Sequence, residues 1–158
     1  MSKVVEAADV IKKGGIVVFP TRTLYGIGVD AFNTEAVNRV FHVKHRAATN
    51  PISVLIKSID DVKFLAAEIP SAALKFMETF WPGRLTIVFK ARPDVPSTLT
   101  ARTGKIGIRI PEHPVAVKLV ASLDCPLTGT SANLSGEPGV DCVEDLSLEI
   151  INSVDRVI

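Results

Sequence analysis

The stretch "VVEAADVIKKGGIVVFP", residues 4–20, decides the fold class because a helical pattern passes directly into a strand pattern. Apolar residues recur at the spacing of one helix face, at Val4, Ala7, Ala8 and Ile11. The glycine pair that follows is typical of a helix C-terminus, and "IVVF" is a short β-branched run that stops at Pro20. We therefore expect a helix over residues 4–13, followed by a buried strand over residues 16–19.

The alternation of helical and strand patterns continues along the chain. Further helices are predicted behind an N-cap at Asn33 and over residues 60–69, 71–80 and 114–123. Further strands are predicted over residues 52–56, 85–89, 105–110, 126–131 and 154–158. No repeat, low-complexity tract or linker divides the sequence. The interleaved pattern predicts a single α/β domain over residues 1–158, with helices packed on a largely buried sheet.

Composition restricts the class of protein. The chain has 158 residues, of which 47% are hydrophobic, so it can bury one sizeable core. Its net charge of +1 indicates no particular partner. Charges throughout residues 1–15 exclude a signal peptide, and no run approaches the roughly 20 apolar residues of a membrane helix. We expect a cytoplasmic protein that makes no contact with a membrane.

The cysteines and histidines do not form a metal-binding pattern. Cys125 and Cys142 are seventeen positions apart, and the three histidines, His42, His45 and His113, follow no ligand spacing. The sequence therefore predicts neither a disulfide framework nor a dedicated metal site.

Polar loops at the ends of predicted strands contain most of the unusual chemistry. Five such loops span residues 20–28, 44–51, 81–86, 104–114 and 130–136. Ligands of open α/β sheets bind where strands end, so we expect these loops to meet in one crevice. Lys44 and Arg46 are two positions apart, so in an extended loop both would point to one polyphosphate. The small polar residues of "TSANLSG", 130–136, suit a backbone nest for phosphate oxygens.

Each of these features also has a simpler explanation. A Lys-x-Arg pair is usually part of a solvated surface, and residues 130–136 taken alone are a typical capped turn. Tyr25 and Trp81 are expected to pack at the edge of the core. Arg109 is harder to explain in this way, since it interrupts an apolar strand and burying an unpaired guanidinium costs several kcal/mol. We expect Arg109 to meet a carboxylate, either of the protein or of a ligand.

The order of five motifs is more informative than any one of them. "GGIVVFPTRTLYGIG", "KHRAATNP", "PGRLTIVF", "IGIRIPEHPVA" and "PLTGTSANLSGEP" closely resemble the successive motifs of the YrdC/TsaC family, the threonylcarbamoyl-AMP synthases. The resemblance implies a twisted mixed sheet with a wide concave ligand face. It also implies a nucleotidyltransferase that makes L-threonylcarbamoyladenylate and pyrophosphate from L-threonine, bicarbonate and ATP, with Mg²⁺. Other proteins then transfer the threonylcarbamoyl group to tRNA.

The same resemblance implies roles for individual residues. Lys44 and Arg46 match the Lys-x-Arg pair that meets the ATP phosphates, and they are the predicted catalytic residues. Further nucleotide contacts are expected from Asn50, Lys105, Ser131 and Asn133. Threonine is expected at Thr23 and Arg109, with the guanidinium of Arg109 paired with the threonine carboxylate.

Some positions depart from the family pattern. Arg22 stands where Asp or Glu is common, and Ala47 replaces a proline. Leu55 replaces a histidine near threonine, and Lys105 replaces a threonine in a way that favours phosphate binding. The chain ends at "SVDRVI", 153–158, before the strand and arginine segment that the family usually carries. We therefore expect a C-terminally short form of the domain.

Two alternatives share the expected fold. Six basic residues against one acid lie between Arg84 and Arg109, which suits a non-catalytic paralogue that binds tRNA or double-stranded RNA by backbone shape. The sequence has no aromatic-rich motif of the kind that stacks single-stranded bases. A carbamoyl-adenylate-forming relative would keep the ATP site without needing threonine. Dependence of turnover on threonine separates the synthase from both.

Overall fold

Helix α1 (Lys3–Lys12) and strand β1 (Val17–Pro20) lie where the stretch 4–20 predicts them. They belong to a computed structural model that describes residues 2–158. Ser2 is the N-cap of α1, and its hydroxyl accepts a hydrogen bond from the first turn. Behind the helix, Gly14 has a φ of 83°, a left-handed conformation that glycine adopts without strain. The predicted helix and strand are confirmed.

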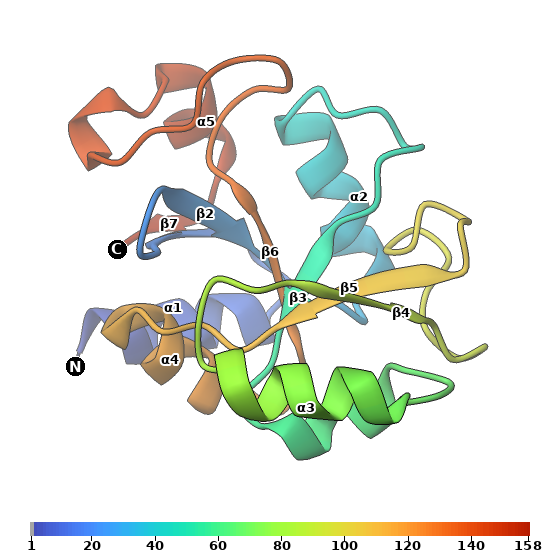
Figure 1. Ribbon diagram of the computed structural model, residues 1–158. Coiled ribbons are helices and arrows are strands. Elements are labelled where there is room, and N and C mark those ends of the chain that lie inside the picture. Colours follow the sequence, from blue (N-terminus) through green and yellow to red (C-terminus); the bar gives the residue numbers. More distant parts are fainter. Residues whose placement is uncertain (1) are drawn as a thin grey trace.

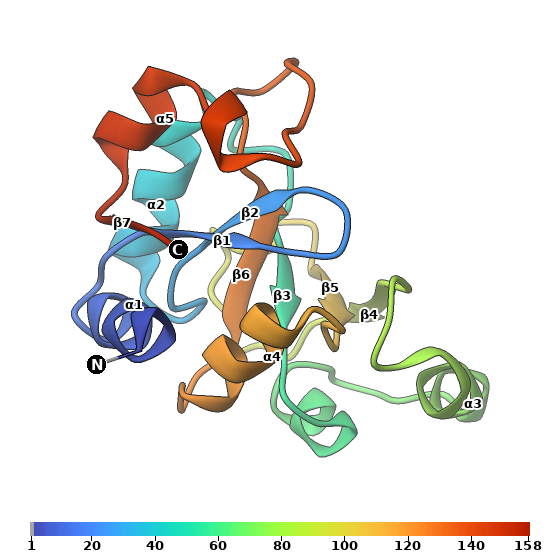
Figure 2. The same cartoon turned by 90° about the vertical axis from the view of Figure 1, so that its left-hand side faces the viewer.

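One mixed sheet of seven strands runs through the molecule, in the order β4-β5-β3-β6-β2-β1-β7. The other strands are β2 (Tyr25–Gly28), β3 (Ser53–Leu55), β4 (Ile87–Lys90), β5 (Lys105–Arg109), β6 (Leu127–Ser131) and β7 (Arg156–Val157). Strand β1 pairs with β7, and β3 with β5, in parallel; the other neighbours are antiparallel. Figures 1 and 2 show that the sheet twists along its length. The predicted single α/β domain with a twisted mixed sheet is confirmed.

Helices cover both faces of the sheet near β1 and β2. Helices α1 and α4 lie on one side of these strands, and α2 and α5 lie on the other (Figure 1). None of the helices in the described chain is long and apolar enough to cross a membrane. The elements beyond α1 are α2 (Thr34–Val43), η1 (Ile59–Phe64), α3 (Ser71–Phe80), α4 (Pro114–Ala121), η2 (Val143–Asp145) and α5 (Leu148–Ser153), with η marking 3₁₀ helices.

The pleat of β1 divides its side chains between two cores. Val17 and Phe19 are fully buried with Leu55 and Leu127 in the cluster under α1 and α4. Val18 is fully buried in the larger cluster on the opposite face, which includes the apolar side of α2. Successive side chains of a strand point to opposite faces, so a strand covered on both sides is apolar at every position. This explains the unbroken "IVVF" run.

Three segments differ from the sequence prediction. Strand β2 occupies part of the stretch 20–28, which the sequence analysis describes as a loop. The strand was not predicted because glycine has a low strand propensity. A Cβ built on Gly28 would lie 2.7 Å from the side chain of Leu127, so the glycine allows two strands to pack closely. Residues 60–69 begin with a 3₁₀ helix instead of an α-helix, and Ala66 already takes part in a β-bridge. Helix α5 was not predicted, because its six residues are too few to show a helical period.

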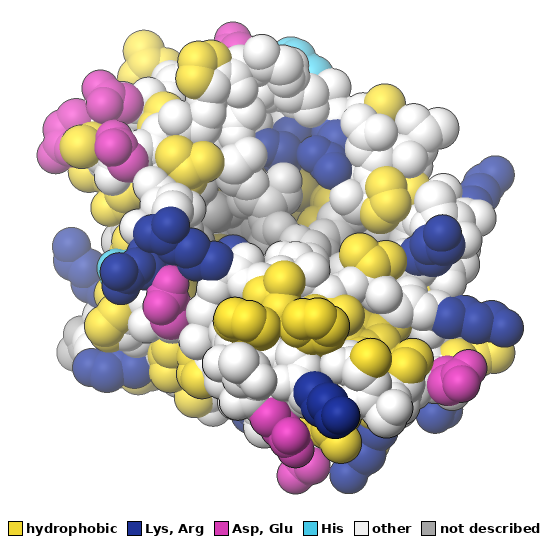
Figure 3. Space-filling model, viewed as in Figure 1, with side chains coloured by type: hydrophobic (Ala, Val, Ile, Leu, Met, Phe, Trp, Pro, Cys, Tyr) yellow, Lys and Arg dark blue, Asp and Glu magenta, His cyan; other side chains and the backbone are white. Residues whose placement is uncertain are grey.

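Small residues of strands β2, β3, β5 and β6 form a hollow on the face of the sheet that α1 and α4 cover only in part. Gly26 is paired with Ser131, and Gly129 with Ser53. A Cβ built on Gly107 would lie 3.3 Å from the Cβ of Ser53, so this glycine adjoins the same set. Figure 3 shows the hollow near the centre of the molecule, with Lys and Arg side chains at its walls. We call these five residues the floor, and they provide the concave face that the resemblance predicts.

Candidate functional site

One end of the floor forms a cavity of 140 Å³ beneath the loop that joins β1 to β2. Its lining includes Phe19, Thr23, Tyr25, Leu55, Arg109 and Ser131. Thr23 and Arg109 also line a smaller cavity of 20 Å³. The structure thus brings together the two residues predicted to hold threonine. Leu55, at the position of the family histidine, contributes an apolar wall.

Arg109 is a half-buried cation at the end of β5. Its neighbour in the register is Leu55 on β3, which cannot pair with a charge. Within residues 2–158, no hydrogen bond or salt bridge joins the guanidinium to another side chain. Burial lowers the pKa of Arg109, and the charge of Glu112 opposes that shift. Because an unpaired cation is costly to bury, the site is suited to receive a carboxylate from a ligand.

Glu112 is a site residue that the sequence reasoning missed. Its Oε1 lies 3.4 Å from the Nε of Arg22 and 3.9 Å from the Nε of Arg84. All three residues line the 20 Å³ cavity together with Arg109. The available signal was the position of Glu112, three residues after Arg109 and therefore at the same end of β5.

Lys44 follows α2 and is buried, with only 1% of its surface exposed. Its Nζ donates to the backbone carbonyl of Ser131 and, at 2.6 Å, to that of Asn133. The Lys44 carbonyl in turn accepts a hydrogen bond from the N–H of Ser135 at 2.8 Å. Burial, and then Arg46, lower the pKa of Lys44 to about 8. Lys44 therefore tethers the loop after β6 to the end of α2, with two of the three donors of its ammonium in use.

The Lys-x-Arg segment is a turn, so the expectation of an extended loop is wrong. The residue between the two cations, His45, has a left-handed φ of 49°. Arg46 consequently has partners different from those of Lys44: it donates from Nε to the carbonyl of Asn50 at 3.1 Å and from Nη2 to that of Pro51 at 2.8 Å. Burial lowers the pKa of Arg46. Lys44 therefore binds the loop after β6, whereas Arg46 binds the segment just before β3.

The loop "TSANLSG", 130–136, already uses part of the backbone that the expected nest requires. Three of its N–H groups already donate to carbonyls of the protein, those of Ala132, Asn133 and Ser135. The side-chain amide of Asn133 braces the loop by donating to the carbonyls of Leu134 and Glu137, each at 2.8 Å. In the described part of the chain, the buried Oδ1 of Asn133 has no hydrogen-bond partner. The loop therefore offers a ligand its side chains, above all the hydroxyl of Ser131.

The other end of the floor forms a second cavity, of 430 Å³. Its lining includes Pro51, Ser53, Thr86, Val88, Lys105 and Gly107. Arg46 binds the carbonyl of Pro51, so the loop that holds Arg46 also forms one wall of this cavity. Lys105 and Asn50 are exposed here. The residues predicted to contact the nucleotide therefore gather at this end and beside Ser131.

Several of the predicted site residues lie in or beside the two floor cavities, and Arg46 also lines a separate cavity with His45 and Thr49. Ser131 lines the cavity that contains Arg109, and its carbonyl accepts a hydrogen bond from Lys44. The first cavity thus offers an unpaired guanidinium for a carboxylate, with the ammonium of Lys44 beside it, and the second cavity offers the ammonium of Lys105. This arrangement suits a ligand pair that brings a carboxylate and a polyphosphate together.

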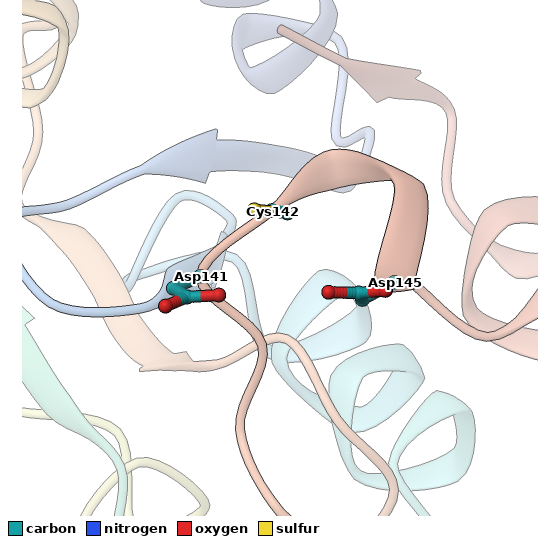
Figure 4. A group of neighbouring side chains, drawn as sticks. All are labelled: Asp141, Cys142 and Asp145. Carbon is teal, nitrogen blue, oxygen red and sulfur yellow. The ribbon is translucent and has the colours of Figure 1, made fainter.

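A separate cluster of ligand-type side chains lies in the loop before and within η2. One ligand atom each of Asp141, Cys142 and Asp145 lies within 4.8 Å of the others. Figure 4 shows the two carboxyl groups directed toward each other. All three residues are exposed, and Asp141, more than its other neighbours, raises the pKa of the Cys142 thiol. None of the three residues lines a cavity of the floor, so this cluster is not part of the candidate site.

The chain is similar to known proteins over almost its whole length. The family model Sua5_yciO_yrdC, described as telomere recombination, matches residues 9–158. The threonylcarbamoyl-AMP synthase of Pyrococcus abyssi is 36% identical over 152 residues, which cover 96% of this chain and 45% of the relative. That of Bacillus subtilis is 36% identical over 149 residues, which cover 94% of this chain and 43% of the relative.

A solved structure is similar over almost the whole chain. The crystal structure of P. abyssi Sua5 complexed with L-threonine matches with a TM-score of 0.94 and 35% identity, covering 98% of this chain and 46% of that one. The chain therefore spans less than half the length of these relatives. The match of the family model covers nearly the whole sequence, and the chain belongs to the Sua5/YciO/YrdC family.

Proposed function

We propose that the chain forms L-threonylcarbamoyladenylate and pyrophosphate from L-threonine, bicarbonate and ATP. The unpaired guanidinium of Arg109 carries this proposal, because it shares a cavity with Ser131, whose carbonyl binds Lys44, and because Lys105 lines the second cavity of the floor. The threonylcarbamoyl-AMP synthases of P. abyssi and B. subtilis support it, as does the Sua5 structure with L-threonine.

Arg109 would bind the carboxylate of threonine. Its planar fork suits bidentate pairing with a carboxylate, and the low solvent exposure of the site strengthens such a pair. Thr23 offers a hydroxyl from the loop between β1 and β2, and Leu55 offers an apolar wall for the substrate methyl group. With the carboxylate held in this way, the amine is the group left to react.

Two bonds form in sequence in the proposed reaction. The amine nitrogen bonds to the carbon of bicarbonate, and loss of water leaves a carbamate. A carbamate oxygen then bonds to the α-phosphorus of ATP, while the bond to the bridging oxygen breaks and pyrophosphate leaves with the electron pair. Neither step requires a nucleophile of the protein, so alignment and neutralisation of charge are sufficient.

Lys44 and Arg46 are the proposed catalytic residues, because Lys44 binds the loop after β6 and Arg46 binds the carbonyl of Pro51 at the wall of the second cavity. The third donor of Lys44 would bind a phosphate oxygen, and Arg46 and Lys105 would offset charge on pyrophosphate. We propose that magnesium enters on the phosphates of ATP as part of the substrate. The described residues that line the two floor cavities are neutral or cationic, so they offer no carboxylate ligand to the ion.

The product is a mixed anhydride, which is an activated acyl donor. We propose that it passes to proteins that transfer the threonylcarbamoyl group to tRNA. The reaction would take place in the cytoplasm, where ATP and tRNA are available.

Release of pyrophosphate tests the proposed function. Release should require both L-threonine and bicarbonate, and mass spectrometry should detect the mixed anhydride. The matched control is Arg92→Ala, which removes an exposed arginine from an ion pair with Asp94 (3.0 Å) and should turn over normally. Turnover that ignores threonine would identify a carbamoyl-adenylate-forming relative. Salt-sensitive tRNA binding without any turnover would identify an RNA-binding paralogue.

A further inference from the structure

Three charged side chains from three different loops meet at the mouth of the Arg109 cavity. Arg22 comes from the loop between β1 and β2, Arg84 from the segment between α3 and β4, and Glu112 from the segment between β5 and α4. The Nε atoms of both arginines approach the same carboxylate oxygen of Glu112, at 3.4 Å and 3.9 Å. We call this group the mouth cluster.

Glu112 is also a neighbour of Arg109. Both line the 20 Å³ cavity, and the charge of Glu112 acts on the guanidinium of Arg109. A carboxylate of the protein near an unpaired arginine competes with the carboxylate of a ligand for that arginine. In the structure Glu112 nevertheless pairs with the two arginines of the mouth and forms no salt bridge with Arg109 within the described chain.

We propose that Arg22 and Arg84 are positioning residues that hold Glu112 at the mouth and so keep Arg109 available for the carboxylate of the substrate. This inference rests on the proposed binding of an amino acid at Arg109. It assigns a use to Arg22, whose charge is opposite to the one common in the family. The combined attraction of Arg22 and Arg84 for the carboxylate of Glu112 exceeds that of Arg109 alone.

The exposure of the three side chains sets the size of the effect. The side chains of Arg22 and Arg84 are 61% and 67% exposed, and that of Glu112 is 30% exposed. Exposed ion pairs contribute little to stability, so the cluster can shift between partners without unfolding the domain. Its influence is therefore expected on substrate affinity, with little effect on the chemical step.

Steady-state kinetics with the whole chain test the proposal. The double variant Arg22→Ala/Arg84→Ala frees Glu112 to pair with Arg109, so the KM for L-threonine should rise about fivefold with kcat within about twofold. Addition of Glu112→Gln to the double variant removes the competitor and should return KM to within about twofold of the wild type. The conservative variant Arg22→Lys/Arg84→Lys keeps both charges and should behave as the wild type. Arg92→Ala is again the matched control.

A measurement without substrate separates this proposal from the proposed function. NMR of arginine side chains reports the chemical shift and hydrogen exchange of the Nε–H of Arg109. In the double variant, a new pair with Glu112 should shift this signal and slow its exchange, and Glu112→Gln should abolish the change. If the wild type neither binds nor turns over threonine, the proposed function fails, while this signal still reports where Glu112 lies.

Two results would overturn the inference. The first is a double variant whose KM for threonine and Arg109 signal both match the wild type. The second is a KM increase in Glu112→Gln alone as large as that of the double variant. Glu112 would then hold the substrate directly, for example through the threonine ammonium group.

Discussion

Lys44 and Arg109 are two cations of one site in opposite states. The ammonium of Lys44 is buried and donates to two backbone carbonyls, so the protein satisfies most of its hydrogen-bonding capacity. The guanidinium of Arg109 is half-buried and has no side-chain partner within residues 2–158. Lys44, at the proposed phosphate site, is therefore held in place before a ligand binds, whereas Arg109, at the proposed amino-acid site, needs a ligand to complete its pairing.

The difference separates stability from binding at the two ends. Removal of a group that satisfies buried carbonyls costs folding free energy, because those carbonyls lose their donor. Removal of an unpaired cation costs little folding free energy and can relieve a desolvation penalty. Variants at Lys44 should therefore affect both stability and ATP binding, and variants at Arg109 should affect threonine binding alone.

The largest effect is expected from Lys44→Met, which keeps most of the aliphatic volume and removes the ammonium. The carbonyls of Ser131 and Asn133 lose their donor, so the free energy of unfolding should fall by about 2 kcal/mol. ATP should bind at least about tenfold more weakly, because the phosphate loses a charge-assisted hydrogen bond. Urea denaturation and calorimetric titration with ATP measure the two changes.

Lys105→Ala is the matched control for Lys44→Met. Lys105 is exposed, lines the second cavity and is also proposed to contact the nucleotide. Its removal should weaken ATP binding only a few-fold and leave unfolding unchanged, since exposed charges contribute little to stability. An unfolding free energy of Lys44→Met equal to that of the wild type would remove the contrast between the two cations.

The second effect is the loss of threonine binding in Arg109→Ala. Without the fork that pairs with the carboxylate, threonine should bind at least about tenfold more weakly, and the free energy of unfolding should change by less than about 1 kcal/mol. Arg109→Lys keeps the charge without the fork and should lie between the two. Calorimetric titration with L-threonine, and with threoninol as a ligand that lacks the carboxylate, gives the comparison. Equal affinity of the wild type for both ligands would contradict the role of Arg109.

The smallest effect is a pH dependence that belongs to the phosphate end. Burial and Arg46 lower the pKa of Lys44 to about 8, so its ammonium loses its proton as pH rises through that value. ATP affinity should fall over the same range, and the affinity of Lys44→Met should stay flat. Titrations between about pH 6.5 and 9.5 test this. A wild type whose affinity stays constant across that range would show that the charge of Lys44 does not reach the phosphates.

The stability contribution of Lys44 has the opposite sign. Its pKa is lower in the folded state than its usual value of 10.5, so between pH 8 and 10.5 the unfolded chain binds more protons. Stability from this residue therefore rises with pH through that window, while ATP affinity falls. The difference in unfolding free energy between the wild type and Lys44→Met isolates this term from the other groups that titrate there.

Sequence periodicity predicted most of the fold and failed where glycine or short length removed the signal. The helix at 71–80 and the strand at 105–110 have strong patterns and lie where predicted. Strand β2 was missed because two of its four residues are glycines, which have low strand propensity and here serve close packing. The 3₁₀ helix η1 was mistaken for an α-helix because both have similar apolar spacing over one or two turns.

The sequence suggests which residues form the candidate site, but it does not predict how their side chains are arranged. The need of Arg109 for an anion follows from its place in an apolar strand, whereas the sequence leaves open whether the protein or a ligand provides that anion. The turn at His45 was not, because a left-handed φ in a residue other than glycine leaves no trace in a single sequence. The hydrogen bonds of Lys44 to the loop after β6 join positions 87 and 89 residues apart, and no local pattern indicates such a contact.

The floor of the site consists largely of residues with little or no side chain, at Gly26, Ser53, Gly107, Gly129 and Ser131. A surface of this kind has almost nothing to exchange, because any larger residue would fill the hollow. Differences in ligand specificity are therefore expected to come from substitutions around the floor, at positions such as Arg22 in a loop and Lys105 at the start of β5. The floor can stay unchanged while substitutions in the residues around it alter which ligand is bound.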